Sequence, residues 1–290
     1  MKWALISLVL LMGIMLSSCA GRTPVWNRAG EERLPETTLL DEAALLRSEG
    51  DTFFKEGARE ERVRDALVRW QQAVDIDPRD HDVYQRISRA YAFLATEHLP
   101  EDADEQARAA EEGIVAAERA LMLISPEFGE RMARGANIVE GMEVLGAEAA
   151  QALYWYAVNL DVWLQHQSRW VRMRKKGHSE LAVNRVLELD EQCLHGAAHR
   201  FFGKKLAARD EFDEAREHLE KALEMAPEHL TNRLLLAKMI AVPLQDREMF
   251  EEHLGFILEA EDEVLVEQLP EVEGVRERAR VLFARTEELF

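Results

Sequence analysis

Residues 196–229 read GAAHRFFGKKLAARDEFDEAREHLEKALEMAPEH, and this segment carries the clearest indication of the fold. Its apolar residues recur at intervals of three and four in two runs, which is the period of amphipathic helices. Gly203 in the first run and Ala215 in the second are small, as expected where two helices cross closely and a larger side chain would push them apart. Pro227 follows the second run and cannot continue a helix. The stretch therefore predicts two antiparallel helices joined by a short turn.

The same spacing of small, large and terminating residues recurs elsewhere in the chain. The other copies are Ala66, Trp70, Ala73 and Pro78; Gly113, Ala117, Ala120 and Pro126; and, in a weaker form, Leu236, Ala237 and Ile240 followed by Phe250, Leu254 and Ile257. A unit of about 34 residues that pairs two helices resembles the tetratricopeptide repeat (TPR). Stacked units bury a continuous core and leave a concave face, which is the usual binding surface. We therefore predict an all-α fold, a TPR-like α-solenoid of antiparallel helix pairs, for residues 41–290.

Residues 127–191 do not follow the repeat and are predicted to form long helices interrupted near Gly177. They contain the run ALYWYAVNLDVW at 152–163. Together with VLELD at 186–190, HGAAH at 195–199 and AREHLEKAL at 215–223, this run resembles the T component of tripartite ATP-independent periplasmic (TRAP) transporters.

This resemblance extends from about Ala133 to Phe290 and carries expectations about function. It implies a lipoprotein of helical repeats that forms a homo-oligomer, a trimer, with a pore through each subunit. It also implies a partner, the periplasmic solute-binding protein of the transporter, and a small hydrophobic ligand that is bound or passed on. TPR lipoproteins also serve as scaffolds for the assembly of envelope complexes without transporting a ligand, and this alternative stays open.

A short apolar run opens the chain, from Ala4 to Leu16. It is too short to span a bilayer, which needs about 20 apolar residues, but it has the length of a signal-peptide core. The sequence LSSCAG at 16–21 follows and resembles the lipobox of bacterial lipoproteins, in which the cysteine is acylated. We therefore predict a lipoprotein signal peptide over residues 1–18, with ordinary secretory cleavage as the alternative.

Lipidation of Cys19 would hold the protein at a membrane surface, since each buried CH₂ of an acyl chain contributes about 0.8 kcal/mol. Residues 19–40 have no sustained apolar period and are predicted to form a lipidated tether, in part packed on the domain. Ala20, rather than Asp, follows the cysteine. By resemblance to the sorting rule of bacteria with two membranes, this favours the periplasmic face of the outer membrane.

The chain contains 36 basic and 55 acidic residues, which gives a net charge of −19. Such a charge argues against nucleic-acid binding, because basic surface supplies that affinity. It also argues against docking on anionic lipid, so the acyl chains are expected to do the anchoring. Of the two cysteines, Cys193 has no partner for a disulfide if Cys19 is acylated.

An aromatic stripe is the first candidate for a ligand-binding or pore-lining surface. Trp155, Asn159 and Trp163 are four residues apart, so they share one face of a helix, and Trp170 continues the series. Two indoles and an amide on one face are suited to line a channel or to hold an apolar ligand. Packing between helices, with the indole N–H groups satisfied locally, is the alternative.

Several polar side chains are predicted to point towards the concave face of the repeats: Arg47, Asp51, Gln85, Arg89, Arg200 and Lys204. Of these, Arg89, Arg200 and Lys204 are the candidates for partner binding. Arg200 and Lys204 are cations in an acidic protein and would bind a carboxylate of a ligand or partner. Ordinary surface charge on a helix is the alternative.

The only dense basic cluster consists of Arg169, Arg172, Arg174, Lys175 and Lys176. It would face an acidic partner or lipid head groups, or form an exposed helix end, where cations favour the C-terminal dipole.

His195 and His199 are four residues apart and would share a helical face, as metal ligands do. No glutamate follows His195 and no third ligand is evident, so no metal site is predicted. The chain also has no phosphate-binding glycine loop, no nucleophile elbow and no metal-binding cysteine set. We therefore predict no catalytic residues, no cofactor and no enzyme activity.

Overall fold

The computed structural model describes residues 22–27, 37–56, 59–99, 101–261 and 269–290, and within these ranges it contains helices but no strand. The elements are η1 (Val25–Asn27), η2 (Thr37–Leu39), α2 (Leu40–Lys55), α3 (Glu60–Ile76), α4 (His81–Phe93), η3 (Leu94–His98), α5 (Ala103–Ile124), α6 (Pro126–Ala133), α7 (Ile138–Met142), η4 (Ala147–Ala149), α8 (Ala150–Gln165), α9 (Arg169–Arg174), α10 (His178–Leu189), α11 (Cys193–Ala207), α12 (Phe212–Met225), α13 (Leu230–Leu236), η5 (Ala237–Ala241), α14 (Val242–Leu244), α15 (Arg247–Glu259), α16 (Leu269–Phe283) and α17 (Thr286–Leu289). None of the helices in these ranges is both long enough and apolar enough to cross a membrane.

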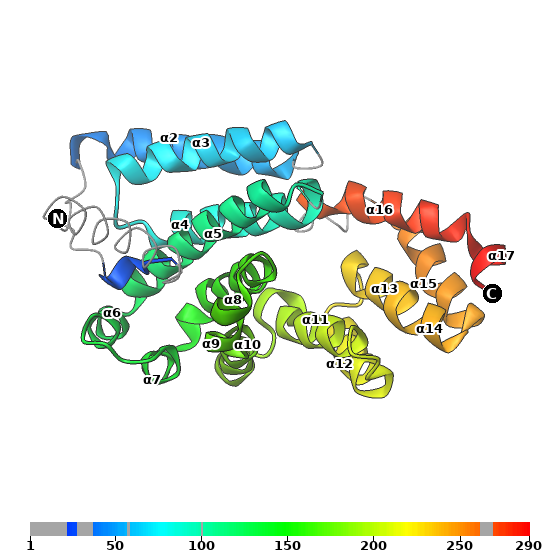
Figure 1. Cartoon of the computed structure of the whole chain (residues 1–290). Coiled ribbons are helices and arrows are strands. Elements are labelled where there is room, and N and C mark those ends of the chain that lie inside the picture. The colour runs from blue at the N-terminus through cyan, green and yellow to red at the C-terminus, as the bar shows by residue number, and fades with distance from the viewer. Residues whose placement is uncertain (1–21, 28–36, 57–58, 100, 262–268) are drawn as a thin grey trace, which may run out of the picture.

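The predicted helix pairs are present, and the all-α prediction is confirmed (Figure 1). Helix α2 packs against α3, α4 against α5, α11 against α12, and α13 against α15. Small residues lie at the crossings. A Cβ atom on Gly203 would lie 2.5 Å from Cγ of Leu219, and one on Gly50 would lie 2.5 Å from Nε1 of Trp70. Ala215 is fully buried, so close approach of the helices explains the small residue in each repeat.

Polar caps determine where several helices begin. The Asp80 carboxylate accepts a hydrogen bond from the backbone N of Val83 at 3.1 Å. Ser125 caps α6 in the same way, and Pro126 occupies the first turn, where no N–H partner is needed. Of the proline breaks predicted from the sequence, Pro126 therefore opens a helix, whereas Pro78 and Pro227 lie in the turns between helices.

The prediction of long helices over residues 127–191 is wrong for the first part of this stretch. Short helices α6 and α7 and the turn η4 occupy it instead. Gly135 has a φ of 92°, which ends α6, and Asn137 begins α7 with a reciprocal cap to Glu140. The predicted break near Gly177 is confirmed, because Gly177 has a φ of 78° just before α10. Helices α8 and α10 then pack together as a further pair, with α9 between them in sequence.

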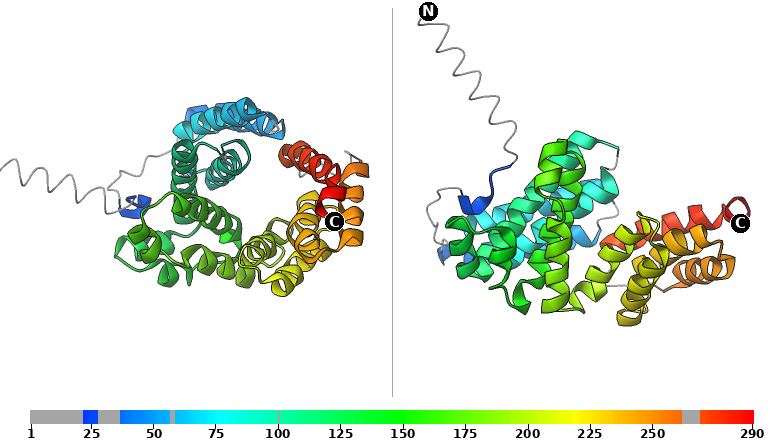
Figure 2. Two further views of the ribbon diagram at one scale, coloured as in Figure 1. Left: turned by 45° about the vertical axis from the view of Figure 1, so that its right-hand side comes forward. Right: turned by 60° about the horizontal axis from the view of Figure 1, so that its bottom comes forward.

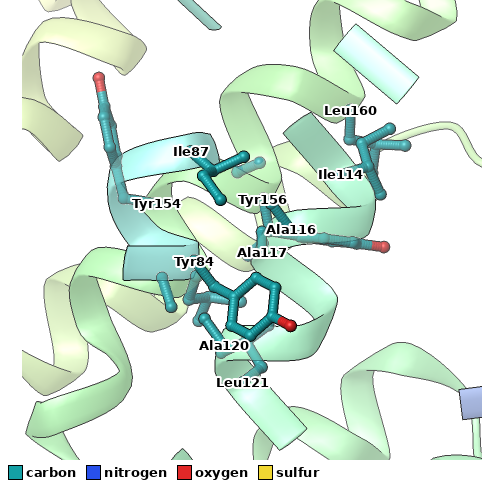
Figure 3. Close-up of a cluster of buried hydrophobic side chains, with 14 of the residues drawn as sticks. Tyr84, Ile87, Ile114, Ala116, Ala117, Ala120, Leu121, Tyr154, Tyr156 and Leu160 are labelled. Carbon is teal, nitrogen blue, oxygen red and sulfur yellow. The ribbon is translucent and has the colours of Figure 1, made fainter. Parts of the chain in front are cut away.

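The largest core lies where α4, α5 and α8 meet (Figure 3). Ala117 and Ala120 on α5 are fully buried and allow the neighbouring helices to approach. Ile87 from α4 and Leu160 from α8 belong to the same buried cluster, in which Leu160 lies beside Ile114 (Figure 3). Full burial of one such aliphatic side chain contributes about 1.5–3 kcal/mol to stability, so the junction of these three helices is a main source of the stability of the fold.

The path of the helices curves until the C-terminal helix α16 lies beside the N-terminal repeats (Figure 2). Two ion pairs join these distant segments. Arg278 of α16 pairs with Glu97 of η3, and Nη2 of Arg89 on α4 lies 3.5 Å from Oε1 of Glu271 on α16. The solenoid is therefore closed into a ring by contacts between its two ends.

The predicted signal peptide (residues 1–18) and Cys19 lie outside the described residues, as does most of the predicted tether. The described segment 22–27 packs on the domain. The buried Arg22 guanidinium donates to both carboxylate oxygens of the buried Glu118, at 2.5 and 2.8 Å. Trp26 meets Phe128 edge-on, with ring centroids 5.7 Å apart. This part of the predicted tether is thus fixed to α5 and α6.

Candidate functional site

The ring of helices encloses a cavity of about 540 Å³. Its walls come from α4 and η3, from α8 and α11, from α13 and η5, and from α16. Its volume lies within the range of about 300–1,000 Å³ that is usual for small-molecule sites. Because α4 and η3 on one side and α16 on the other contribute wall residues, the cavity depends on the closure of the ring by α16.

The lining combines an apolar surface with an excess of positive charge. The larger apolar side chains are Phe93, Trp155, Val158, Val162, Phe201, Leu235 and Met239. The charged ones are Arg89, Arg200, Lys204, Lys205 and Arg278, together with Glu97, Asp161 and Glu271. Cations outnumber acids here, although the whole chain has a net charge of −19. The chemistry of the lining therefore suits an apolar molecule that carries an acidic group.

Two irregular helical turns border the cavity. The segments η3 and η5 are π-helical, and they contribute Thr96, Glu97 and Met239 to the wall. π-Helical turns are rare and occur frequently at functional sites.

Most of the cavity charges are paired with each other. Lys205 pairs with Asp161, and Arg278 pairs with Glu97. The side chain of Lys204 has no hydrogen bond or ion pair with any other residue that the structure describes, yet protein surrounds it closely enough that burial lowers the pKa of its ammonium group. Lys204 is therefore the cation in this wall that is available to an acidic group of a ligand.

Arg200 also lies in the wall, but its donors are used within the protein. Its guanidinium donates to the carbonyl oxygens of His195 at 2.6 Å and Leu194 at 2.7 Å, and to Oδ1 of Asn232 at 3.2 Å. Burial lowers the pKa of the Arg200 guanidinium. Its most direct structural role is to fix the backbone where α11 begins.

That backbone takes an unusual left-handed turn. Leu194, His195 and Gly196 have φ values of 49°, 59° and 75°, a conformation that costs about 1–2 kcal/mol for each residue other than glycine. The prediction that His195 and His199 share a helical face is therefore wrong, because the chain reverses its handedness between them. The carbonyls that accept from Arg200 belong to this turn, so the arginine stabilises it.

The two histidines consequently have different neighbours. The His195 ring lies beside the His229 ring, with centroids 5.7 Å apart. Nδ1 of His199 lies 2.9 Å from Nδ1 of His218, and its Nε2 lies 3.1 Å from Oε1 of Glu191. Among the described residues, no group of three or more His, Cys, Asp or Glu side chains is arranged to hold a metal ion.

The four residues of the aromatic stripe occupy different environments. Trp155 lines the cavity, and its buried Nε1 has no acceptor among the described residues. Asn159 is fully buried between helices, where its Nδ2 donates to the backbone oxygen of Ser88 at 3.0 Å and to Ser88 Oγ at 3.1 Å. Trp163 is buried in the core and does not line the cavity. Trp170 is 48 % exposed on the surface.

The prediction that these four residues share one pore-lining face is therefore wrong. Asn159 and Trp163 are buried against the neighbouring helices, whereas the face of α8 that lines the cavity includes Trp155. That face carries Tyr154, Val158 and Asp161, none of which the sequence reasoning selected. Asp161 was detectable in principle, since it is the only carboxylate in the apolar run 152–163. Burial raises the pKa of the Tyr154 hydroxyl to about 12, so the hydroxyl stays protonated.

Arg89 lies between the main cavity and a second hollow beside the first two repeats, and it lines both. Asp51 and Gln85 line the second hollow, as their predicted concave position requires. Asp51 accepts a hydrogen bond from Nε of Arg86 at 2.9 Å. Arg47 instead pairs with Asp80, at 3.1 Å, and does not line either space.

Cys193 has the surroundings of a structural cysteine. Its side chain is buried, and burial raises the pKa of its thiol to about 12. A thiol with so high a pKa is a poor nucleophile near neutral pH.

Comparison with models of protein families shows to which family the chain belongs. The family model described as TRAP transporter T-component matches residues 73–290, well over half of the chain and all of the cavity wall. A comparison with curated proteins finds no match. The family is one of transporter accessory components, in accordance with the resemblance read from the sequence. The chain belongs to the T-component family of TRAP transporters.

Proposed function

We propose that this chain is a periplasmic accessory subunit that docks the solute-binding protein of a TRAP transporter and binds or passes a small, largely apolar ligand. Acylation at Cys19 attaches it to the periplasmic face of the outer membrane. The observation that carries the proposal is the cavity of about 540 Å³ inside the closed ring. A repeat protein that serves only as a scaffold needs a concave surface, whereas a closed ring with a lined interior is suited to a ligand.

The lining supports a ligand of mixed character. Phe93, Phe201 and Met239 supply apolar surface, and Lys204 supplies a cation whose side chain has no ion pair or hydrogen bond within the described part of the chain. A hydrogen bond that involves a charged group contributes about 1.5–3 kcal/mol to the free energy of the interaction, which is more than a hydrogen bond between two neutral groups contributes. An acidic group on an otherwise apolar ligand would therefore bind beside Lys204.

The ligand role is tested with two fluorescent probes that differ in charge. 1-Anilinonaphthalene-8-sulfonate carries a sulfonate, and N-phenyl-1-naphthylamine is its neutral counterpart. Lys204→Gln is expected to weaken binding of the sulfonate probe about tenfold, by loss of one charge-assisted bond, with little change for the neutral probe. The matched control is Lys221→Gln on the exposed surface of α12. Equal affinities of both variants for the sulfonate probe would contradict the proposed ligand site.

The partner role is tested by crosslinking the tagged protein in its native envelope and identifying the captured proteins by mass spectrometry. Recovery of a periplasmic solute-binding protein or a TRAP membrane subunit is the expected result. Recovery of only outer-membrane assembly or secretion components would contradict transport and favour the scaffold. Mass analysis of the N-terminal peptide tests acylation of Cys19 separately, because an unmodified cysteine would contradict the anchor without affecting the other two tests.

A further inference from the structure

The residues around α9 differ from the rest of the protein in charge. No acidic residue occurs from position 162 to 179, while Arg169, Arg172, Arg174, Lys175 and Lys176 fall within eight positions. Elsewhere, arginines are commonly paired with carboxylates, as in Arg64 with Glu60 and Glu105, Arg131 with Glu127, and Arg247 with Glu251 and Glu287. None of the five cations around α9 has an ion pair or a side-chain hydrogen bond within the part of the chain that the structure describes. The cluster therefore holds a positive charge that the protein itself leaves unneutralised.

Large apolar side chains are exposed among these cations. Val171 is buried and fixes α9 to the domain. Trp170 and Met173, three positions apart and thus on one side of the helix, are 48 % and 66 % exposed. The Arg174 guanidinium lies over the Trp170 ring, 4.7 Å from its centroid. Trp170 is the only tryptophan in the described residues that is exposed.

The surface formed by Arg169, Trp170, Arg172, Met173, Arg174 and Lys176 is called the α9 patch. Exposed tryptophan beside cations is typical of segments that lie at a membrane–water interface, where the indole occupies the head-group region and the cations meet anionic lipid. An acidic protein segment would also be attracted by this charge, so the choice of lipid rests on where the anchored end of the chain lies.

The start of the described chain lies close to this patch. Arg22 is held by its buried ion pair with Glu118. Lys175 lies close enough to both side chains to be affected by their charges. Burial has the largest effect and lowers the pKa of Lys175; the positive charge of Arg22 lowers it further, and the negative charge of Glu118 raises it. Cys19 precedes Arg22 by three residues, and three extended residues span at most about 10 Å. An acyl chain on Cys19 would therefore enter the membrane close to α9.

We propose that the α9 patch rests on the anionic phospholipid head groups of the membrane that anchors the chain, so that the domain is held against the lipid in one orientation. This proposal rests on the acylation of Cys19 proposed above. The net charge of −19 does not prevent it, since charges farther from the lipid than about 8 Å are largely screened at physiological salt. Contact between the domain and the lipid therefore depends mainly on the cations of the α9 patch.

This orientation has a consequence for the cavity. Arg172 and Lys176 border a groove whose wall also includes Asp161, Gln165 and Lys205. The last three residues line the main cavity as well. One side of the cavity would therefore lie next to the membrane surface, where an apolar ligand would enter or leave.

The test uses the acylated protein in phosphatidylcholine vesicles with brominated acyl chains, with and without one quarter of phosphatidylglycerol. Bromine quenches tryptophan fluorescence on contact, so quenching reports whether Trp170 reaches the lipid. The expected result is quenching that is stronger with phosphatidylglycerol and is lost in Trp170→Phe. The double variant Arg172→Gln/Lys176→Gln should reduce it, since each cation beside an anionic surface strengthens attraction roughly fivefold.

The matched control is Arg280→Gln/Arg285→Gln, which changes the net charge equally at exposed positions near the C-terminus. It should leave the quenching unchanged. Equal quenching in the parent protein and in Trp170→Phe, or equal effects of both double variants, would overturn the proposal. Failure of the protein to sediment with vesicles would overturn the anchor on which it rests, and neither result depends on the partner or ligand tests.

Discussion

Glu118→Gln is expected to lower the free energy of unfolding by about 3 kcal/mol. The Glu118 side chain is fully buried and the Arg22 side chain is 3 % exposed. The carboxylate accepts three hydrogen bonds, from Nη1 and Nη2 of Arg22 at 2.5 and 2.8 Å and from the backbone N of Val25 at 2.8 Å. Glutamine keeps the shape but places an amide N–H₂ against a donor.

Removing one member of a buried pair costs about 3–5 kcal/mol, because the other charge is left unpaired. The lower end of this range is expected here, since segment 22–27 precedes the helices and can leave its site to hydrate Arg22. Departure of the segment would also remove Trp26 from its edge-on contact with Phe128.

Urea unfolding followed by circular dichroism measures the loss, and trypsin cleavage after Arg22 reports departure of the segment. Glu111→Gln is the control, because Glu111 is 41 % exposed and lies 4.0 Å from Nε of the same arginine. A long contact with an exposed carboxylate contributes little, about 0–1 kcal/mol. If Glu118→Gln costs no more than Glu111→Gln and leaves Arg22 protected from trypsin, the buried pair does not hold the start of the chain.

Four further variants test stability. Asn159→Ala should lower the free energy of unfolding by about 2–3 kcal/mol, because two hydrogen bonds to Ser88 at about 1 kcal/mol each are lost and a cavity is left behind. Affinity for the sulfonate probe should not change. A loss of probe affinity at unchanged stability in urea unfolding would contradict the place of Asn159 in the core. Gly203→Ala should cost about 1–3 kcal/mol by overpacking, because its Cβ would lie 2.5 Å from Leu219 Cγ. Gly255→Ala, with no atom within 4 Å of the new Cβ, should stabilise α15 by about 0.5–1 kcal/mol; thermal unfolding of the two variants should move in opposite directions. Burial lowers the pKa of His229 from 6.5 to about 2, so the unfolded chain binds a proton below 6.5 that the folded chain does not. Stability should therefore fall as the pH falls, by about 1.4 kcal/mol from this residue at about pH 5.5, and His229→Gln should reduce the slope measured by urea unfolding at a series of pH values.

The helical repeats and the family can both be predicted from the amino-acid sequence alone. Periodicity and small residues such as Gly203 and Ala215 report contacts within one helix pair, which are local in the chain. Proline breaks and capping residues such as Ser125 act within a single turn, so helix starts were also readable. The family resemblance could be detected without the tertiary structure, because it consists of short runs of residues that follow one another along the chain.

The cavity that these helices enclose could not be predicted from the sequence and required the three-dimensional structure. Helix α8 is apolar on most of its surface, so its spacing could not tell which face would meet α4 and α5 and which, with Tyr154 and Val158, would line the cavity. The left-handed turn at 194–196 separated two histidines that a regular helix would have placed together. Closure of the ring rests on pairs such as Arg278 with Glu97, which lie 181 residues apart. Short-range patterns carry no information on such contacts, because these depend on the summed curvature of every helix pair between the two residues.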